Sequence, residues 1–219
     1  HATGDLMKNK LDPEELAAQE TMGEFTIDDC RQLVLSSKRV VAIGEIGLDY
    51  YYKPKSKIRL EEFKNRQKQA LLEQMDLAKE LDLPIAFHCR SAHGDLIEIL
   101  KVQKAKGVIH CFTGTWEQAQ EYLGMGLYLG FNGIIFKQIV GIDWQETIIK
   151  TPLEKILVET DAPYLTPLPA IALAKAGPAL RNEPLFVKEV VKEIAKIKQM
   201  SYQEVSEITT QNARKLFNI

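Results

Sequence analysis

The apolar residues of the chain form short continuous runs separated by more polar segments. Such runs are typical of strands that are buried on both faces of a parallel sheet. Five runs predict strands, near residues 39–44, 84–88, 107–110, 126–131 and 155–158. The segments between the runs favour helices, and this alternation is typical of an α/β fold. The 219 residues suffice for a sizeable core, and we expect a single domain over residues 1–219.

Apolar residues at helical spacing predict the main helices. These helices cover residues 5–21, residues 26–37, a segment from about Lys57 onward, and a late segment between Val187 and Ile197. Ser or Thr followed three residues later by Glu or Gln marks a helix start, which predicts further N-termini at Thr115 and Ser201. A loop rich in Pro and Ala spans residues 162–184, and loops of this length are usually functional or mobile.

Four of the apolar runs end in a side chain that can bind a metal ion or transfer a proton. These side chains are Glu45, His88, His110 and Asp161. The carboxyl ends of parallel strands meet at one edge of the sheet, where α/β folds place their chemistry. A lone histidine there is more often a hydrogen-bonded structural residue, and a lone carboxylate is often a helix N-cap. Two imidazoles and two carboxylates at equivalent positions indicate a site for one or two Zn, Mn or Fe ions.

Three motifs around these residues resemble those of the TatD family of metal-dependent hydrolases. They are Gly44-Glu45-Ile46-Gly47-Leu48-Asp49, His110-Cys111-Phe112-Thr113-Gly114 and Glu159-Thr160-Asp161-Ala162-Pro163-Tyr164-Leu165. The resemblance continues to the end of the chain and covers about residues 39–219. It implies a distorted (β/α)8 barrel of the TIM type, with two divalent cations (Mg, Mn or Zn) at its mouth and nuclease activity. Carried over by position, Glu45 bridges the two cations, His88 and His110 bind one of them, and Asp161 binds the other.

The chain departs from the family pattern in one respect. The family begins with a His-x-His pair after its first strand, and the histidines here are His1, His88, His93 and His110. Five strands cannot close an eight-stranded barrel, so we expect the first three strands, on the order of 60 to 80 residues, to be missing before residue 39. The alternative is a natural short form that lacks one metal ion. We read His93 as a surface residue and not as a ligand.

Basic and aromatic residues follow the first motif. A positively charged segment runs from Lys53 to Lys68 directly after Tyr50, Tyr51 and Tyr52. Cations beside aromatic rings suit the phosphates and bases of a single nucleic-acid strand, although the charges equally fit the solvated face of a helix and Tyr51 or Tyr52 equally fits a core. Candidate substrate-binding residues are Tyr50, Lys53, Arg90, Arg181 and Asn182, with an ordinary helix start as the alternative for Asn182. Arg90 shares a strand face with His88, and Glu159 shares one with Asp161, where it could hold a histidine or pair with Arg90.

The combined prediction is a divalent-metal-dependent phosphodiester hydrolase, a TatD-like deoxyribonuclease or 3'-5' exonuclease, with Asp161 and Glu45 as catalytic residues. Alternatives are a hydrolase of a small molecule or an aminoacyl-tRNA ester, and a metal-poor scaffold without activity. The net charge of −2 gives no general attraction to nucleic acid, so DNA binding must come from a local patch. The absence of long apolar runs and the three cysteines without zinc-site spacing predict a cytoplasmic protein with free thiols, no membrane contact and no obligate protein partner.

Overall fold

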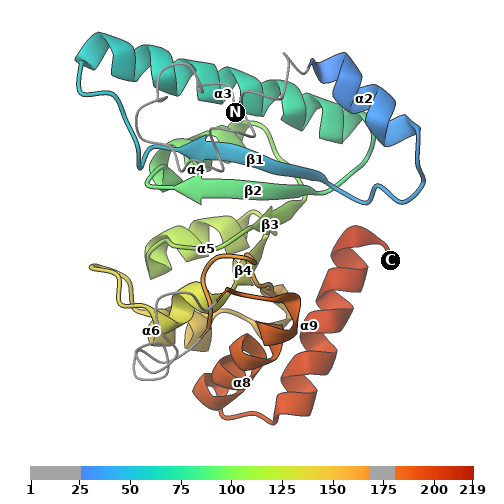
Figure 1. Cartoon of the computed structure of the whole chain (residues 1–219), viewed down its shortest axis with the longest axis vertical. Helices are drawn as coiled ribbons and strands as arrows, with labels where there is room; N and C mark the ends of the chain where they lie inside the picture. Colours follow the sequence, from blue (N-terminus) through green and yellow to red (C-terminus); the bar gives the residue numbers. More distant parts are fainter. Residues whose placement is uncertain (1–25, 168–180) are drawn as a thin grey trace.

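The computed structural model describes residues 26–167 and 181–219, and these form a parallel α/β fold (Figure 1). The strands are β1 (Ile43–Asp49), β2 (Ile85–Arg90), β3 (Gly107–Ile109), β4 (Tyr128–Phe131) and β5 (Ile156–Val158). The helix expected over residues 5–21 lies outside the described residues. The other expected helices are present as α2 (Ile27–Leu35), α3 (Lys57–Glu80), α5 (Trp116–Gly124), α8 (Val187–Lys198) and α9 (Tyr202–Phe217). Both expected capping boxes are formed, at Thr115 and Ser201.

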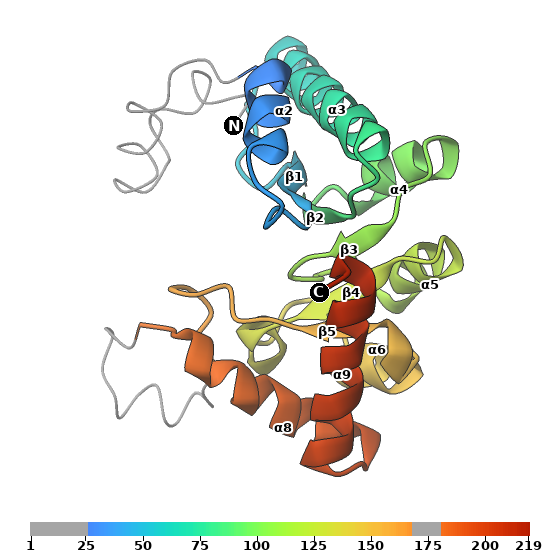
Figure 2. The ribbon, with the colours of Figure 1, turned by 90° about the vertical axis from the view of Figure 1, so that its right-hand side faces the viewer.

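The strands lie side by side in the order in which they occur along the chain, and each pairs in parallel with the next. Helices α3, α4 (His93–Val102), α5 and α6 (Trp144–Lys150) form an arc along one side of the strands (Figure 2). A sheet that advances in one direction with its helices on one face is the topology of a barrel, whereas a doubly wound sheet reverses its strand order. The described strands therefore follow the barrel arrangement that the sequence predicts.

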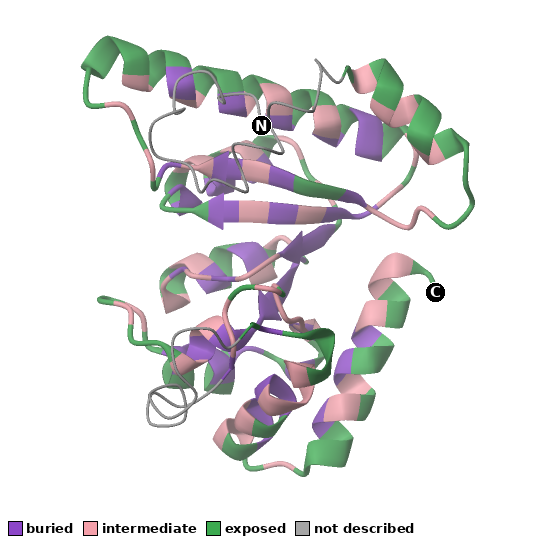
Figure 3. Ribbon diagram, in the orientation of Figure 1, coloured by how far each residue is buried: buried purple, intermediate pink, exposed green. Residues whose placement is uncertain are grey.

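The main core lies between the strands and this arc of helices (Figure 3). Alternate residues of β1 and β2 point into it, among them Leu48 and Phe87, both completely buried. A smaller cluster lies on the other face of the sheet, where Val108, Tyr128 and Leu157 pack against the C-terminal part of α9. Cys30, Cys89 and Cys111 are all free thiols, as expected. Within the described residues, none of the helices has the length and hydropathy needed to cross a bilayer.

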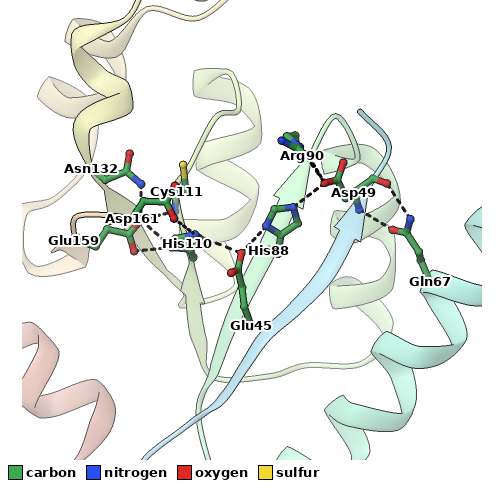
Figure 4. Close-up of polar contacts among 10 residues, drawn as sticks. All are labelled: Glu45, Asp49, Gln67, His88, Arg90, His110, Cys111, Asn132, Glu159 and Asp161. Atoms are coloured by element: carbon green, nitrogen blue, oxygen red, sulfur yellow. Dashed lines mark hydrogen bonds and ion pairs between the residues drawn. The ribbon is translucent and has the colours of Figure 1, made fainter. Parts of the chain in front are cut away.

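The prediction for the first strand is wrong in its position. The sequence suggested a strand over residues 39–44 that stops before Glu45, but β1 continues to Asp49. The register against β2 shifts between Gly44 and Ile46, so Glu45 is an additional residue in a β-bulge. The bulge lets Ile43 and Ile46, three positions apart, both face the core, while Glu45 projects toward His88 (Figure 4).

The prediction for His93 is also wrong, because this residue is buried and only 6% exposed. It begins α4, and its Nδ1 lies 3.1 Å from the hydroxyl of Tyr122. Phe112 and Tyr122 contact the ring edge to face, and no hydrogen-bond partner for Nε2 occurs in the described part of the chain. Burial lowers the pKa of His93 to about 4.

This buried histidine predicts a loss of stability in acid. Its pKa is lower in the folded state than the unfolded value near 6.5, so the unfolded chain binds more protons between the two values. The free energy of unfolding should therefore fall by about 2 kcal/mol between pH 7 and pH 5 because of this group alone. Urea denaturation of the protein and of its His93→Gln variant at both pH values isolates the effect. Equal pH dependence in the two proteins contradicts the prediction.

Candidate metal and active site

Four predicted side chains meet at the carboxyl ends of the strands (Figure 4). The Oε1 atom of Glu45 lies 2.6 Å from Nδ1 of His88 and 3.4 Å from Nε2 of His110. The same Nε2 lies 3.6 Å from Oδ1 of Asp161. Strands β1 and β2 carry Glu45 and His88, while His110 and Asp161 follow β3 and β5. The structure thus brings together residues that are up to 116 positions apart in the sequence, with Glu45 at the centre.

The chemistry of these donors fits a divalent cation. Ligands about 2.0–2.1 Å from a tetrahedral ion lie about 3.3 Å from each other, close to the separations of Glu45 from His110 and of His110 from Asp161. The 2.6 Å contact between Glu45 and His88 is instead a hydrogen bond. Across residues 26–167 and 181–219, no group of three or more His, Cys, Asp and Glu side chains is arranged to hold a metal ion. The donors therefore match a cation in type, and their assignment as ligands is a proposal.

Glu159 orients the ring of His110 by contacting Nδ1, the ring nitrogen that does not face Glu45. Both of its carboxylate oxygens lie 3.0 Å from Nδ1 of His110, and Oε1 also accepts hydrogen bonds from the backbone N–H of Cys111 at 2.7 Å and from the side-chain amide of Asn132 at 3.0 Å. With Nδ1–H donating to Glu159, the Nε2 lone pair of His110 faces Glu45 and Asp161. Burial lowers the pKa of His110, but Glu159 outweighs it and the net shift is upward. Of the two roles considered for Glu159, the structure shows the contact with a histidine.

Asp49 is a residue of this cluster that the sequence analysis did not single out. Its Oδ2 accepts two hydrogen bonds from Arg90, 3.0 Å from Nε and 2.6 Å from Nη2, and lies 3.4 Å from Nε2 of His88. Burial raises the pKa of Asp49, but the hydrogen bonds from His88 and Arg90 lower it to about 2. Burial lowers the pKa of His88, and Asp49 and Glu45 together raise it to about 9. In the structure, Asp49 pairs with Arg90 in the register of β1 and β2. Strand alternation, which predicts the side chains that share a face, was the sequence signal that could have found Asp49.

The pKa values of Glu45 and Asp161 are shifted in opposite directions. The hydrogen bond with His88 lowers the pKa of Glu45 despite its partial burial. Burial raises the pKa of Asp161, against the opposing effect of His110.

Two of the predicted substrate-binding residues have structural roles instead. Tyr50 is only 6% exposed, because it continues the core-facing series of Ile46 and Leu48, and its hydroxyl donates to Asp95 at 2.9 Å. Asn182 is 2% exposed, and its side chain makes hydrogen bonds to the backbone of Thr160, Tyr164 and Glu183. Lys53, Arg90 and Arg181 are exposed, which agrees with contact to a substrate. Lys64 and Lys68, by contrast, contact the Tyr50 ring and Asp95.

Asn182 should therefore matter for stability. Its amide donates to the carbonyls of Thr160 and Tyr164 at 2.7 and 2.5 Å, and its Oδ1 accepts the N–H of Glu183 at 2.9 Å. Asn182→Ala removes a buried amide and leaves these backbone groups without it, and we expect the free energy of unfolding to fall by about 2 kcal/mol. Urea denaturation measures the change. The exposed neighbour Arg181→Ala is the control and should change stability by less than about 0.5 kcal/mol.

The comparisons with known proteins identify the family. A family model described as TatD related DNase matches residues 11–218, nearly the whole chain. The chain belongs to this family. The resemblance deduced from the motifs is thus confirmed, and with it the prediction of a hydrolase.

Two curated relatives are similar to this chain over most of its length. The uncharacterized metal-dependent hydrolase YabD of Bacillus subtilis (strain 168) is 41% identical over 186 residues, which cover 83% of this chain and 67% of YabD. The 3'-5' ssDNA/RNA exonuclease TatD of Rahnella sp. (strain Y9602) is 38% identical over 183 residues, which cover 81% of this chain and 65% of that enzyme. The chain therefore spans about two thirds of the length of these relatives.

Solved structures of the TatD family have the same fold. The Escherichia coli K12 TatD homologue YJJV matches with a TM-score of 0.77 and 27% identity, covering 93% of this chain and 74% of YJJV. A TatD family hydrolase from Entamoeba histolytica matches with a TM-score of 0.72 and 25% identity, covering 99% of this chain and 71% of that protein. The predicted parallel α/β fold of TatD type is thereby confirmed.

Proposed function

We propose that this chain belongs to a divalent-metal-dependent nuclease that removes nucleotides from the 3' end of single-stranded DNA. The observation that carries the proposal is the cluster of Glu45, His88, His110 and Asp161, in which one carboxylate is shared by two imidazoles. The name of the Rahnella relative, a 3'-5' ssDNA/RNA exonuclease, supports the substrate and the direction. The single-domain organisation and the cytoplasmic location expected from the sequence are part of the same proposal.

In this function, Glu45, His88, His110 and Asp161 would hold one or two divalent cations. A bound cation supplies Lewis acidity for the scissile phosphate and lowers the pKa of water. Glu159 fixes the ring of His110 so that Nε2 faces Glu45 and Asp161. Asp161 would accept the proton of the attacking water, since its Oδ1 lies in the cluster, 3.6 Å from Nε2 of His110.

The exposed basic residues would bind the phosphates of the strand. Lys53, Lys55, Lys57 and Arg59 are all exposed and follow directly on β1, whose Glu45 is the centre of the cluster. Each phosphate neutralised by a lysine or arginine adds to the salt dependence of binding. Arg181 is exposed next to the loop that carries Asp161, and we include it in the same surface.

The test uses the full-length protein and oligonucleotides labelled at the 5' end. A single DNA strand should shorten one nucleotide at a time from its 3' end, EDTA should stop the reaction, and Mg²⁺, Mn²⁺ or Zn²⁺ should restore it. Parallel reactions with RNA, duplex DNA and a small ester such as p-nitrophenyl acetate compare the substrate classes. Hydrolysis of the small ester without any action on oligonucleotides overturns the nuclease proposal in favour of a small-molecule hydrolase. No hydrolysis of any substrate with any of the three cations favours the scaffold.

A further inference from the structure

Two tyrosines and an arginine form a small aromatic platform beside the cluster. Tyr51 and Tyr52 follow β1 directly, and their rings meet edge to face with centroids 4.8 Å apart and planes at 83°. The guanidinium carbon of Arg90 lies 4.9 Å from the Tyr51 ring centroid and 5.4 Å from that of Tyr52. Both contacts are within the range of a cation–π interaction.

Tyr51 has the largest exposed fraction among the aromatic residues that the structure describes, ahead of Tyr164 at 51% and Tyr202 at 46%. Tyr51 is 59% exposed, whereas Tyr50, Tyr122 and Tyr128 are almost completely buried. A tyrosine that stabilises a core buries its ring, as these three do. Tyr51 instead exposes a large aromatic surface to solvent beside the guanidinium of Arg90, so its ring is available to a ligand.

Asp49 holds the platform in place. Its Oδ1 accepts the backbone N–H of Tyr51 at 2.9 Å, which fixes the chain direction after β1, and its Oδ2 accepts both hydrogen bonds from Arg90. The same Oδ2 contacts His88. One carboxylate therefore positions the tyrosine, the arginine and a histidine of the cluster, and the platform is ordered before a ligand arrives.

The platform lies close enough to the cluster for one ligand to contact both. Arg90 and His88 are two residues apart on β2 and point to the same face, which separates them by about 6.6 Å along the strand. A ligand whose phosphate lies at the cluster could therefore place a neighbouring group on the platform. Lys53 and Lys55, which follow the tyrosines in the sequence, are also exposed.

We propose that Tyr51, Tyr52 and Arg90 form a subsite that stacks one unpaired nucleobase of the substrate, adjacent to the phosphate at the cluster. This inference rests on the proposed nuclease function. Aromatic rings stack on any base, so the subsite selects single strands over duplexes, whose bases are already stacked, without selecting sequence. Arg90 contributes through its planar face over the rings, because its Nε and Nη2 edge is already bonded to Asp49.

The test replaces Tyr51 in the full-length protein and follows two substrates. Stacking contributes about 1–3 kcal/mol per base, so Tyr51→Leu should raise KM for a single-stranded oligonucleotide by about 10- to 100-fold. Tyr51→Phe keeps the ring and should retain nearly the original KM. An oligonucleotide whose last 3' positions are all abasic keeps its phosphodiesters but offers no base to stack, so Tyr51→Leu and Tyr51→Phe should have the same KM for it. Tyr202→Leu, on the distant helix α9, is the matched control because Tyr202 is 46% exposed.

An abasic site moved through the last positions of the oligonucleotide locates the stacked base. At one position, the abasic site should slow cleavage by the wild-type protein. At the same position, it should not slow cleavage by Tyr51→Leu any further. Equal KM values for the original protein and Tyr51→Leu on the oligonucleotide overturn the subsite. A higher KM of Tyr51→Leu than of Tyr51→Phe on the abasic oligonucleotide also overturns it, because the effect then does not depend on a base.

A binding measurement separates this inference from the proposed function. A single strand carrying 2-aminopurine near its 3' end is titrated with the protein in EDTA, where no hydrolysis occurs. Quenching of its fluorescence by the original protein and by Tyr51→Phe, but not by Tyr51→Leu, supports the subsite even if no nuclease activity is found. Hydrolysis of oligonucleotides with identical quenching in all three proteins leaves the nuclease standing and overturns the subsite.

Discussion

Glu45→Gln should reduce metal-dependent hydrolysis of single-stranded DNA by about 1000-fold or more, because stabilisation of the developing charge by a cation is worth several kcal/mol. Glu45 is the one side chain that contacts both histidines of the cluster, at 2.6 and 3.4 Å. The amide has nearly the same shape but one oxygen and no charge, so it cannot bridge two cations or balance their charge. The rate of oligonucleotide shortening at saturating Mn²⁺, together with bound metal measured by mass spectrometry, checks the result.

The control for this substitution is Glu61→Gln on the exposed face of α3. It removes the same charge from the same half of the chain and should leave the rate within about twofold, since surface substitutions usually change little. The far-ultraviolet circular dichroism of both variants should match that of the original protein. A Glu45→Gln variant that is folded, loses its metal and still hydrolyses DNA at the original rate contradicts the proposed site.

The strands and the site residues could largely be predicted because both leave local patterns in the sequence. A continuous apolar run identifies a buried strand, and the polar residue that follows it lies at the edge where neighbouring strands also end. His88, His110 and Asp161 were found in this way, and the structure brings both histidines to Glu45 and Asp161 to His110. The family motifs then supplied what the runs cannot, namely the number of strands and the reaction class.

The features that the sequence did not predict depend on contacts between distant segments. The bulge at Glu45 is a property of how β1 pairs with β2, so the apolar run alone placed the strand end too early. Tyr50 and His93 look like functional or surface residues until the helices that bury them are in place. Asn182 was ambiguous for the same reason, because its three partners belong to a loop whose path is set by tertiary structure.

The second large effect concerns the glycine opposite His88. Gly47 pairs with His88 in the register of β1 and β2, and a Cβ atom at Gly47 would lie 1.8 Å from the carbonyl oxygen of His88. That oxygen belongs to the backbone of a central strand and cannot move aside as a flexible side chain would. Gly47→Ala should therefore separate the two strands and lower the free energy of unfolding by about 4 kcal/mol or more, within the range of severe core substitutions.

Urea denaturation and the rate of DNA hydrolysis together test this expectation, because the displaced strand carries His88. Gly124→Ala is the matched control, since a Cβ there meets nothing within 4 Å and the residue ends helix α5. That control should retain its stability and its activity. If Gly47→Ala loses less than about 1 kcal/mol, the strands must tolerate the added methyl group, and the close approach of β1 to β2 cannot be what holds Glu45 and His88 together.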